Sequence, residues 1–156
     1  MGVSLTQKER SLLQDQQKHE QLCVDKYSAY ANQAKDAQLK QLFTDYAGQE
    51  QTHLNTINQM LSGQVPSMNQ QGQQQQNAKP APQQAAMSVM GNQADAALCD
   101  DMLMTEKYVS GTYDTAIFEF KNADMRNTLN HIQKEEQQHG EGLFNYMQSH
   151  GMYNAQ

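Results

Sequence analysis

The 156-residue sequence has no tryptophan, only three prolines and only two cysteines, Cys23 and Cys99. Two cysteines are too few for a disulfide scaffold, and they are too few and too far apart for a zinc finger. No run of about 18 apolar residues is present, so we expect no membrane-spanning segment. Charged residues make up only 18% of the chain and the net charge is −6. This balance argues against a general nucleic-acid binder, which needs a basic surface for phosphate.

The few prolines all fall in one glutamine-rich segment. Residues 62–87 hold all three prolines and nine of the 26 glutamines, with almost no bulky apolar side chain. Such a segment buries too little surface to fold, so we expect a flexible linker. Its flanks, residues 7–61 and 88–153, lack proline and are rich in helix-forming residues. We therefore predict one domain over residues 1–156, made of two helical hairpins and a long Gln/Pro-rich crossover.

Capping signals divide each flank into two helices. Thr6 to Glu9 reads T-Q-K-E, which fits a capping box, and Gly63 and Gly151 are typical of the residue that follows a helix. The predicted helices, with their N-caps, are residues 7–35 (Thr6), 37–61 (Asp36), 92–121 (Asn92) and 123–150 (Asn122).

The two hairpins are copies of each other, displaced by 86 positions. The matched pairs include Lys35–Lys40 with Lys121–Arg126, Glu20 with Glu106, Tyr27 with Tyr113, and Glu50–His53 with Glu136–His139. A repeated helix pair predicts a pseudo-twofold bundle in which each hairpin buries the apolar face of the other. The linker is long enough to return along the bundle, and it is also long enough to let hairpins pair between chains. The sequence leaves both pairings open.

A polar pair interrupts the apolar seam of the second and of the fourth helix. The two seams read Leu39, Phe43, Tyr46, Glu50, His53, Ile57, Met60 and Met125, Leu129, Ile132, Glu136, His139, Leu143, Tyr146. Five of the seven positions in each are apolar or aromatic, as a bundle core requires. The first and third helices add one mid-seam carboxylate each, Glu20 and Glu106.

Four carboxylates buried together would repel one another strongly, and two divalent cations would neutralise them. Di-metal proteins of the ferritin-like type use one Glu from each of two helices and E-x-x-H from each of the other two. The sequence supplies this set as Glu20, Glu50, His53, Glu106, Glu136 and His139. We expect two iron or manganese ions, bridged by Glu50 and Glu136, since these metals suit carboxylate and imidazole ligands. The alternative is a relic site that keeps the ligands without the metal.

Three further residues lie close to this seam. We interpret Tyr27 and Tyr113 as core aromatics, and the alternative is a hydrogen bond from each tyrosine to a metal ligand. Cys23 lies one turn from Glu20 on the same face. We interpret it as a buried structural thiol rather than as a ligand or a redox group.

The first hairpin resembles rubrerythrins and the wider ferritin-like pattern. Residues 20–53 read EQLCVDKYSAYANQAKDAQLKQLFTDYAGQEQTH, with a Glu, a Tyr seven positions later and a final E-x-x-H. The resemblance implies a ferritin-like four-helix bundle with Glu20, Glu50 and His53 as ligands. The chain lacks the paired CxxC motifs through which rubrerythrins accept electrons, and this departure argues against a rubrerythrin-type peroxidase.

The second hairpin resembles the coat F domain of endospore-forming bacteria over residues 98–153. The matching motifs are M-L-x-x-E-K from Met102, Y-x-x-A-I-x-E from Tyr113 and R-x-T-L from Arg126. This resemblance implies a small protein of the spore coat, made in the mother-cell cytoplasm without a signal peptide.

Two functions follow from these observations. The first is a structural component of the endospore coat that carries the di-metal site, forms a homo-oligomer and contacts other spore coat proteins. The alternative is a di-iron or di-manganese oxidoreductase that disproportionates peroxide or oxidises ferrous iron. We expect no nucleic-acid partner and no membrane partner for either function.

Overall fold

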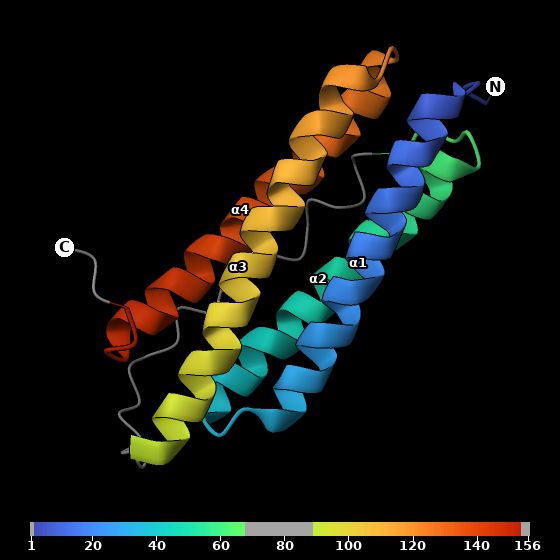
Figure 1. The fold of residues 1–156 in the computed structure, drawn as a ribbon. Coiled ribbons are helices and arrows are strands. Elements are labelled where there is room, and N and C mark those ends of the chain that lie inside the picture. The colour runs from blue at the N-terminus through green and yellow to red at the C-terminus, as the bar shows by residue number, and fades with distance from the viewer. Residues whose placement is uncertain (1, 68–88, 154–156) are drawn as a thin grey trace.

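The structure is a computed structural model that describes residues 2–67 and 89–153. It contains α1 (Gln7–Gln33), α2 (Ala37–Leu61), α3 (Val89–Glu119) and α4 (Ala123–Ser149). Helices α1 and α2 form one hairpin, α3 and α4 form the other, and the two hairpins pack into a bundle (Figure 1). This confirms the predicted all-α fold. Most of the predicted linker, residues 68–87, lies outside the described residues.

Three of the four predicted N-caps are confirmed. Thr6 and Glu9 form the full capping box, and the side chains of Asp36 and Asn122 each accept a backbone N–H from the first turn of their helices. Gly63 and Gly151 follow the ends of α2 and α4 with φ of 81° and 69°. This left-handed conformation favours glycine, which has no Cβ to clash with the backbone.

The predicted ends of α1 and α3 are corrected by contacts between the hairpins. Helix α1 ends at Gln33 because the backbone N–H groups of Lys35 and Asp36 donate to the Asp95 carboxylate, at 2.8 and 2.9 Å, instead of continuing the helix. Helix α3 ends at Glu119, and the N–H of Lys121 donates to Glu9 Oε1 at 2.9 Å. Glu9 and Asp95 are 86 positions apart, so each hairpin closes the turn of the other.

The start of α3 is also corrected. The prediction of Asn92 as an N-cap is wrong, because α3 begins at Val89 and Asn92 lies inside the helix. Residues 89–91 contain no proline to stop the helix from extending upstream. Helix α4 ends at Ser149, one residue before the predicted end.

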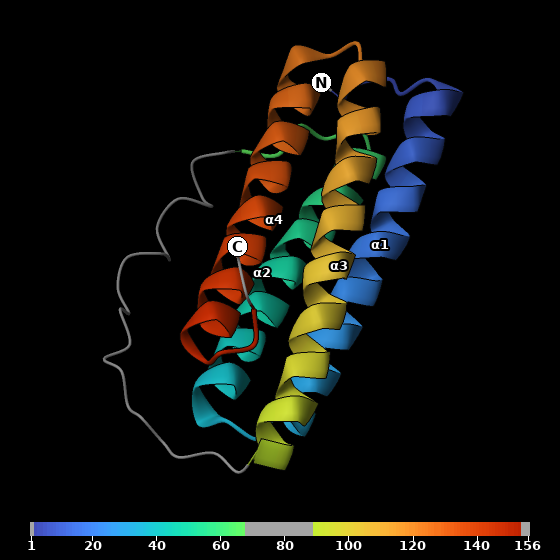
Figure 2. The same ribbon diagram turned by 60° about the vertical axis from the view of Figure 1, so that its left-hand side comes forward.

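The hairpins are joined between opposite ends of the bundle. Helix α2 ends beside the start of the chain, where the N–H of Val3 donates to the carbonyl of Gly63, and α3 begins at the far end (Figure 2). Helices α2 and α3 therefore run parallel, and the chain between them has to cross the length of the bundle, about 38 Å for a 25-residue helix.

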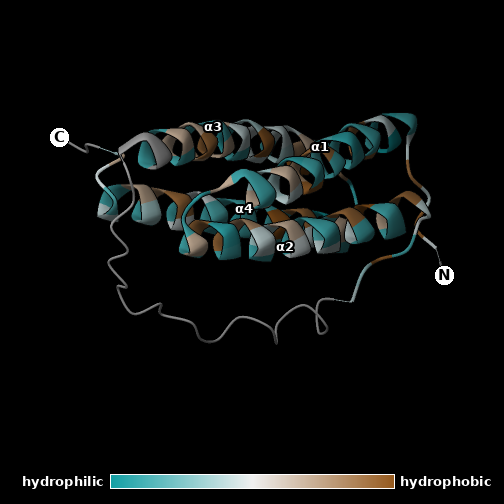
Figure 3. Ribbon diagram, turned by 90° about the horizontal axis from the view of Figure 1, so that it is seen from below, coloured by the Kyte–Doolittle hydropathy of each residue, from teal (hydrophilic) through white to brown (hydrophobic). Residues whose placement is uncertain are grey.

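The core consists of two apolar clusters, one toward each end of the bundle. One contains Leu13, Ile57, Leu129 and Ile132, and the other contains Leu39, Phe43, Leu143 and Met147. Hydrophilic residues cover much of the outward-facing ribbon of α1 and α2 (Figure 3). Within the described residues, none of the helices is both long and apolar enough to cross a membrane. Between the hairpins, α1 packs more closely on α3 than α2 packs on α4. The polar side chains described next lie at the centre of the bundle.

Candidate metal centre

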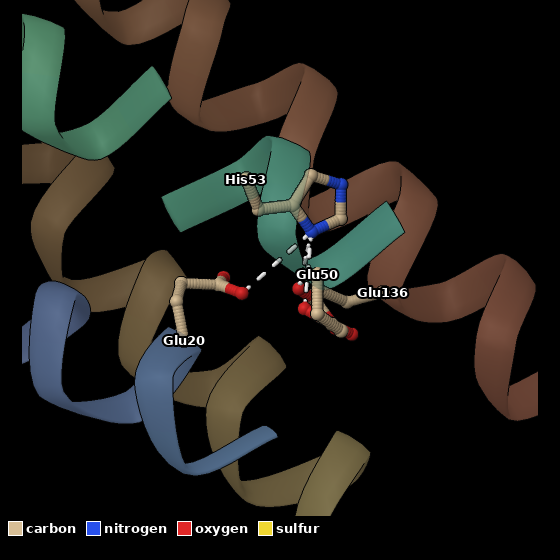
Figure 4. A group of neighbouring side chains, drawn as sticks. All are labelled: Glu20, Glu50, His53 and Glu136. Carbon is tan, nitrogen blue, oxygen red and sulfur yellow. Dashed lines mark hydrogen bonds and ion pairs between the residues drawn. The ribbon is translucent and has the colours of Figure 1, made fainter. Parts of the chain in front are cut away.

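The structure brings all six predicted ligands together in the middle of the bundle. Each of these side chains is at most 2% exposed. They form two overlapping groups whose ligand atoms lie within 4.8 Å of one another: Glu20, Glu50, His53 and Glu136, and then Glu50, Glu106, Glu136 and His139. Figure 4 shows the first group, with His53 facing the three carboxylates. Glu50 and Glu136 belong to both groups, as the predicted bridging ligands should. That the six residues bind metal stays a prediction.

Each histidine turns its Nδ1 atom toward the carboxylates. His53 Nδ1 lies 3.1 Å from Glu50 Oε2 and 2.9 Å from Glu136 Oε1. His139 Nδ1 lies 2.8 Å from Glu50 Oε1 and 3.3 Å from Glu106 Oε1. The histidines thus join carboxylates of different helices, and the Nδ1 atoms are the ring nitrogens that would bind a metal held by this cluster.

Burial and mutual repulsion change the acidity of the carboxyl groups. Burial, together with the neighbouring Glu20, raises the pKa of Glu50 to about 7. Burial and the charge of Glu136 raise the pKa of Glu106 to about 7 and also raise the pKa of Glu20. Glu50 and Glu106 are therefore partly protonated near neutral pH, as expected for carboxyl groups out of contact with water.

The pKa values of the two histidines are also raised, but by the neighbouring carboxylates rather than by burial. Burial alone would lower the pKa of His53 and His139, but hydrogen bonds to the surrounding carboxylates raise both pKa values well above the ordinary range. Burial would raise the pKa of Glu136, but contacts with Glu106 and the two histidines lower it. In the metal-free cluster, protonated imidazoles therefore supply positive charge that divalent cations would otherwise provide.

Carboxylate oxygens that accept no hydrogen bond indicate that the cluster fits a cation. Among the described residues, none donates a hydrogen bond to Glu20 Oε2, Glu106 Oε2 or Glu136 Oε2, and all three atoms are buried. A buried acceptor without a donor costs free energy. A divalent cation that prefers oxygen and imidazole ligands, such as Mn²⁺ or Fe²⁺, would satisfy these oxygens without a donor.

Two tyrosines hold the outer carboxylates from the opposite hairpin. Tyr27 donates its hydroxyl hydrogen to Glu106 Oε1, and Tyr113 donates to Glu20 Oε1, each at 2.5 Å. Both rings are fully buried. The interpretation of these residues as core aromatics is therefore correct, and the alternative, a hydrogen bond to a candidate ligand, is correct as well.

The sequence analysis missed the residues behind the histidines. The Nε2 atom of His139 contacts Gln49 Oε1, and the Nε2 atom of His53 lies 3.6 Å from Glu135 Oε2. Gln49 and Glu135 are equivalent positions of the repeat, and each directly precedes the Glu of an E-x-x-H motif. Their shared position in the repeat, next to a candidate ligand, is the sequence feature that could have identified them. A further neighbour, Tyr46, stacks on the His139 ring at 4.2 Å.

The environments of the two cysteines match an inert role. Both thiols are free and buried. Burial, together with the nearby carboxylates, raises the pKa of Cys23 far above its usual value. Burial also raises the pKa of Cys99. The reactive thiolate form is therefore suppressed at both positions, which agrees with the interpretation of Cys23 as a structural thiol.

Gly142 makes room for the tyrosine beside the site. A Cβ atom at this position would lie 1.8 Å from the Tyr46 hydroxyl oxygen. We expect Gly142→Ala to displace the Tyr46 ring from His139 and to lower the free energy of unfolding by about 1–3 kcal/mol. Thermal melts and the near-ultraviolet tyrosine signal measure both effects. Gly111→Ala, where a Cβ would meet nothing within 4 Å, is the matched control and should stabilise the helix by about 0.5–1 kcal/mol. Equal effects of the two substitutions would contradict this account.

The second hairpin matches a known protein family. Residues 94–156 match the family model described as Coat F domain, which confirms the resemblance found from residues 98–153. No curated protein and no solved structure matches the chain. The matched region contains Glu106, Glu136 and His139, whereas the other three candidate ligands lie before it. The candidate site is thus completed by residues outside the Coat F domain.

Proposed function

We propose that the protein is a structural component of the bacterial endospore coat, in which two iron or manganese ions hold its two hairpins together. The Coat F match supports the location in the coat. The observation that carries the metal proposal is the buried cluster with carboxylate oxygens that accept no hydrogen bond from any described residue. Homo-oligomerisation and contacts with other spore coat proteins are part of the same proposal.

The origin of the ligands supports a structural role for the metal. Three candidate ligands come from the first hairpin and three from the second, and each four-residue group contains residues of both. A cation in either group would therefore bind the hairpins to each other. It would also remove the repulsion between carboxylates that burial makes costly. Because the complete site exists only when the hairpins are docked, metal binding stabilises the docked form by mass action.

The completeness of the ligand set favours a di-metal oxidoreductase as the second candidate. Four carboxylates and two histidines are the full set used by di-metal carboxylate proteins. Bound iron or manganese would supply the redox chemistry for peroxide or ferrous iron. The chain itself positions Glu20 and Glu106 through the hydroxyl groups of Tyr113 and Tyr27. Peroxide disproportionation needs no external electron donor, which fits a chain without CxxC motifs.

Elemental analysis of protein purified without chelator tests the metal proposal. We expect about two iron or manganese ions per chain, and far less in a Glu50→Ala variant, which loses a ligand common to both groups. Asp114→Asn, an exposed change on α3, is the control and should retain the metal. A parent protein that stays metal-free after incubation with Mn²⁺ or Fe²⁺ would overturn the proposal.

Fractionation and turnover separate the two functions. For a coat component, antibody should find the protein in the coat extract of purified spores, and loaded protein should neither release oxygen from peroxide nor oxidise ferrous iron catalytically. Turnover that Glu50→Ala abolishes would instead establish the oxidoreductase. Absence from the coat extract would overturn the structural assignment.

A further inference from the structure

The internal repeat allows the two halves of the site to be compared position by position. The six candidate ligands match across the repeat, but several of their neighbours do not. The unmatched pairs, with the residue of the first hairpin given first, include Gln49 and Glu135, Tyr46 and Ile132, and Cys23 and Val109. Only the first pair changes the charge beside a histidine nitrogen.

The ring of His53 is backed by a carboxylate. Its Nδ1 atom faces the cluster, and its Nε2 atom lies 3.6 Å from Glu135 Oε2, which is an ion-pair contact longer than a hydrogen bond. No described residue accepts a hydrogen bond from this Nε2 atom, so the Glu135 carboxylate is the charged group that faces it. The second oxygen of Glu135 pairs with His131, one turn earlier on α4. This contact fixes the orientation of the Glu135 side chain, which is only partly buried. Glu135 thus lies on the side of the imidazole ring away from the candidate metal position.

The ring of His139 is backed by an amide instead. Its Nε2 atom contacts Gln49 Oε1, while its Nδ1 atom faces Glu50 and Glu106. The amide oxygen can orient the ring by accepting its Nε2 hydrogen, but it carries no net charge. The groups that face the two Nε2 atoms therefore differ by one negative charge, although the direct ligands of the two positions are the same.

We propose that the two metal positions are unequal and fill in order, and that Glu135 is the positioning residue that makes the Glu20–Glu50–His53–Glu136 position the tighter one. This inference rests on the metal binding proposed above. A carboxylate that accepts the outer N–H of a metal-bound histidine makes the imidazole a stronger ligand, and loss of such a partner commonly lowers affinity 10- to 100-fold. The first cation also neutralises part of the charge of Glu50 and Glu136, which the second cation shares.

Titration of the metal-free protein with Mn²⁺ tests the order of filling. Calorimetry measures the two dissociation constants, and electron paramagnetic resonance separates isolated Mn²⁺ from a coupled pair. We expect the parent to bind in two steps at least about tenfold apart, with an isolated-ion spectrum at one equivalent. Glu135→Gln should weaken the first step by about 10- to 100-fold and bring the steps together. Gln49→Glu should tighten the second step. Asp114→Asn removes the same charge from an exposed position and should change neither step.

Ligand variants identify the position that fills first. Glu20→Gln removes a ligand of only the first group, and Glu106→Gln removes a ligand of only the second. Glu106→Gln should therefore retain the tight step, and Glu20→Gln should retain only the weak one. In a chain that also carries Gln49→Glu and Glu135→Gln, this assignment should reverse. Helix content by circular dichroism confirms that each variant is folded.

The results separate failure of this inference from failure of the metal proposal. Two equal steps in the parent, or unchanged steps in Glu135→Gln, would overturn the inference and leave metal binding intact. If Glu135→Gln does not fold, an unchanged second step in Gln49→Glu overturns the inference in the same way. A parent that binds no Mn²⁺ and no Fe²⁺ would overturn both.

Discussion

Replacing Glu50 and Glu136 together by glutamine should make the metal-free protein more stable and abolish its response to metal. Both side chains are buried at the centre of the cluster. Glutamine keeps their size and can accept hydrogen bonds from the histidines, while the charge of Glu136 and the partly ionised carboxyl group of Glu50 leave a site that excludes water. Replacing buried ionic groups with neutral ones commonly stabilises a protein by about 1–4 kcal/mol. We expect a gain of that size in the free energy of unfolding.

Chemical denaturation of parent and double variant, each with EDTA and with Mn²⁺, measures both effects. The parent should gain stability with Mn²⁺, because a ligand that binds only the native state stabilises it by mass action. The double variant should gain nothing. Asp100→Asn with Asp114→Asn removes two exposed charges from α3 and should leave both responses unchanged. A parent that ignores Mn²⁺, combined with a variant that is no more stable than the parent, would contradict the buried-cluster account.

The stability of the metal-free protein should fall as the pH rises from about 5 to 8, and Mn²⁺ should reverse this trend. Glu50 and Glu106 have pKa values raised to about 7, and His53 and His139 have pKa values raised well above the ordinary value. The native state therefore binds more protons than the unfolded chain across this range. Each extra proton makes unfolding easier by about 1.4 kcal/mol per pH unit.

Bound metal reverses the pH dependence of the stability because the cation competes with those protons for the same ligand atoms. Cation binding requires deprotonated carboxylates and neutral imidazoles, so affinity and stabilisation increase with pH. Melting curves from pH 5 to 8, with EDTA and with Mn²⁺, should diverge as the pH rises. His19, whose pKa is lowered by burial, opposes the metal-free trend with a single proton. A metal-free melting temperature that is constant or increases over this range would refute the prediction.

The six residues of the candidate site could be predicted from sequence because helical periodicity fixes their direction. Glu50 and His53 are three positions apart, and so are Glu136 and His139, so each pair lies on one face of its helix. The same periodicity places these residues on the apolar seam, and the repeat doubles the signal. That the hairpins pack seam to seam follows from the need to bury both apolar faces.

The residues that the sequence did not reveal act across the gap between helices. Glu135 lies on α4 but approaches His53 on α2, and Asp95 on α3 ends the helix of the other hairpin at Gln33. Such contacts depend on how far each helix is rotated and how closely it approaches its neighbour. Local propensity carries no information on either quantity. The error at Asn92 has a local cause, because asparagine is typical of N-caps but α3 already begins at Val89.

The hydrogen bonds of Tyr27, Tyr113, Glu9 and Asp95 all pass from one hairpin to the other. No such bond depends on whether the two hairpins belong to the same molecule. Because all of these groups and all six candidate ligands lie on the hairpins and not on the connection between them, a hairpin that docks on a neighbouring molecule regenerates every one of these bonds and the whole cluster. The same interface can therefore close a monomer or, in the homo-oligomer proposed above, join one molecule to the next. If the cluster binds cations as proposed, the cation concentration determines how stably the hairpins of neighbouring molecules stay associated. Chelation of the cations then allows the hairpins to dissociate and exchange partners.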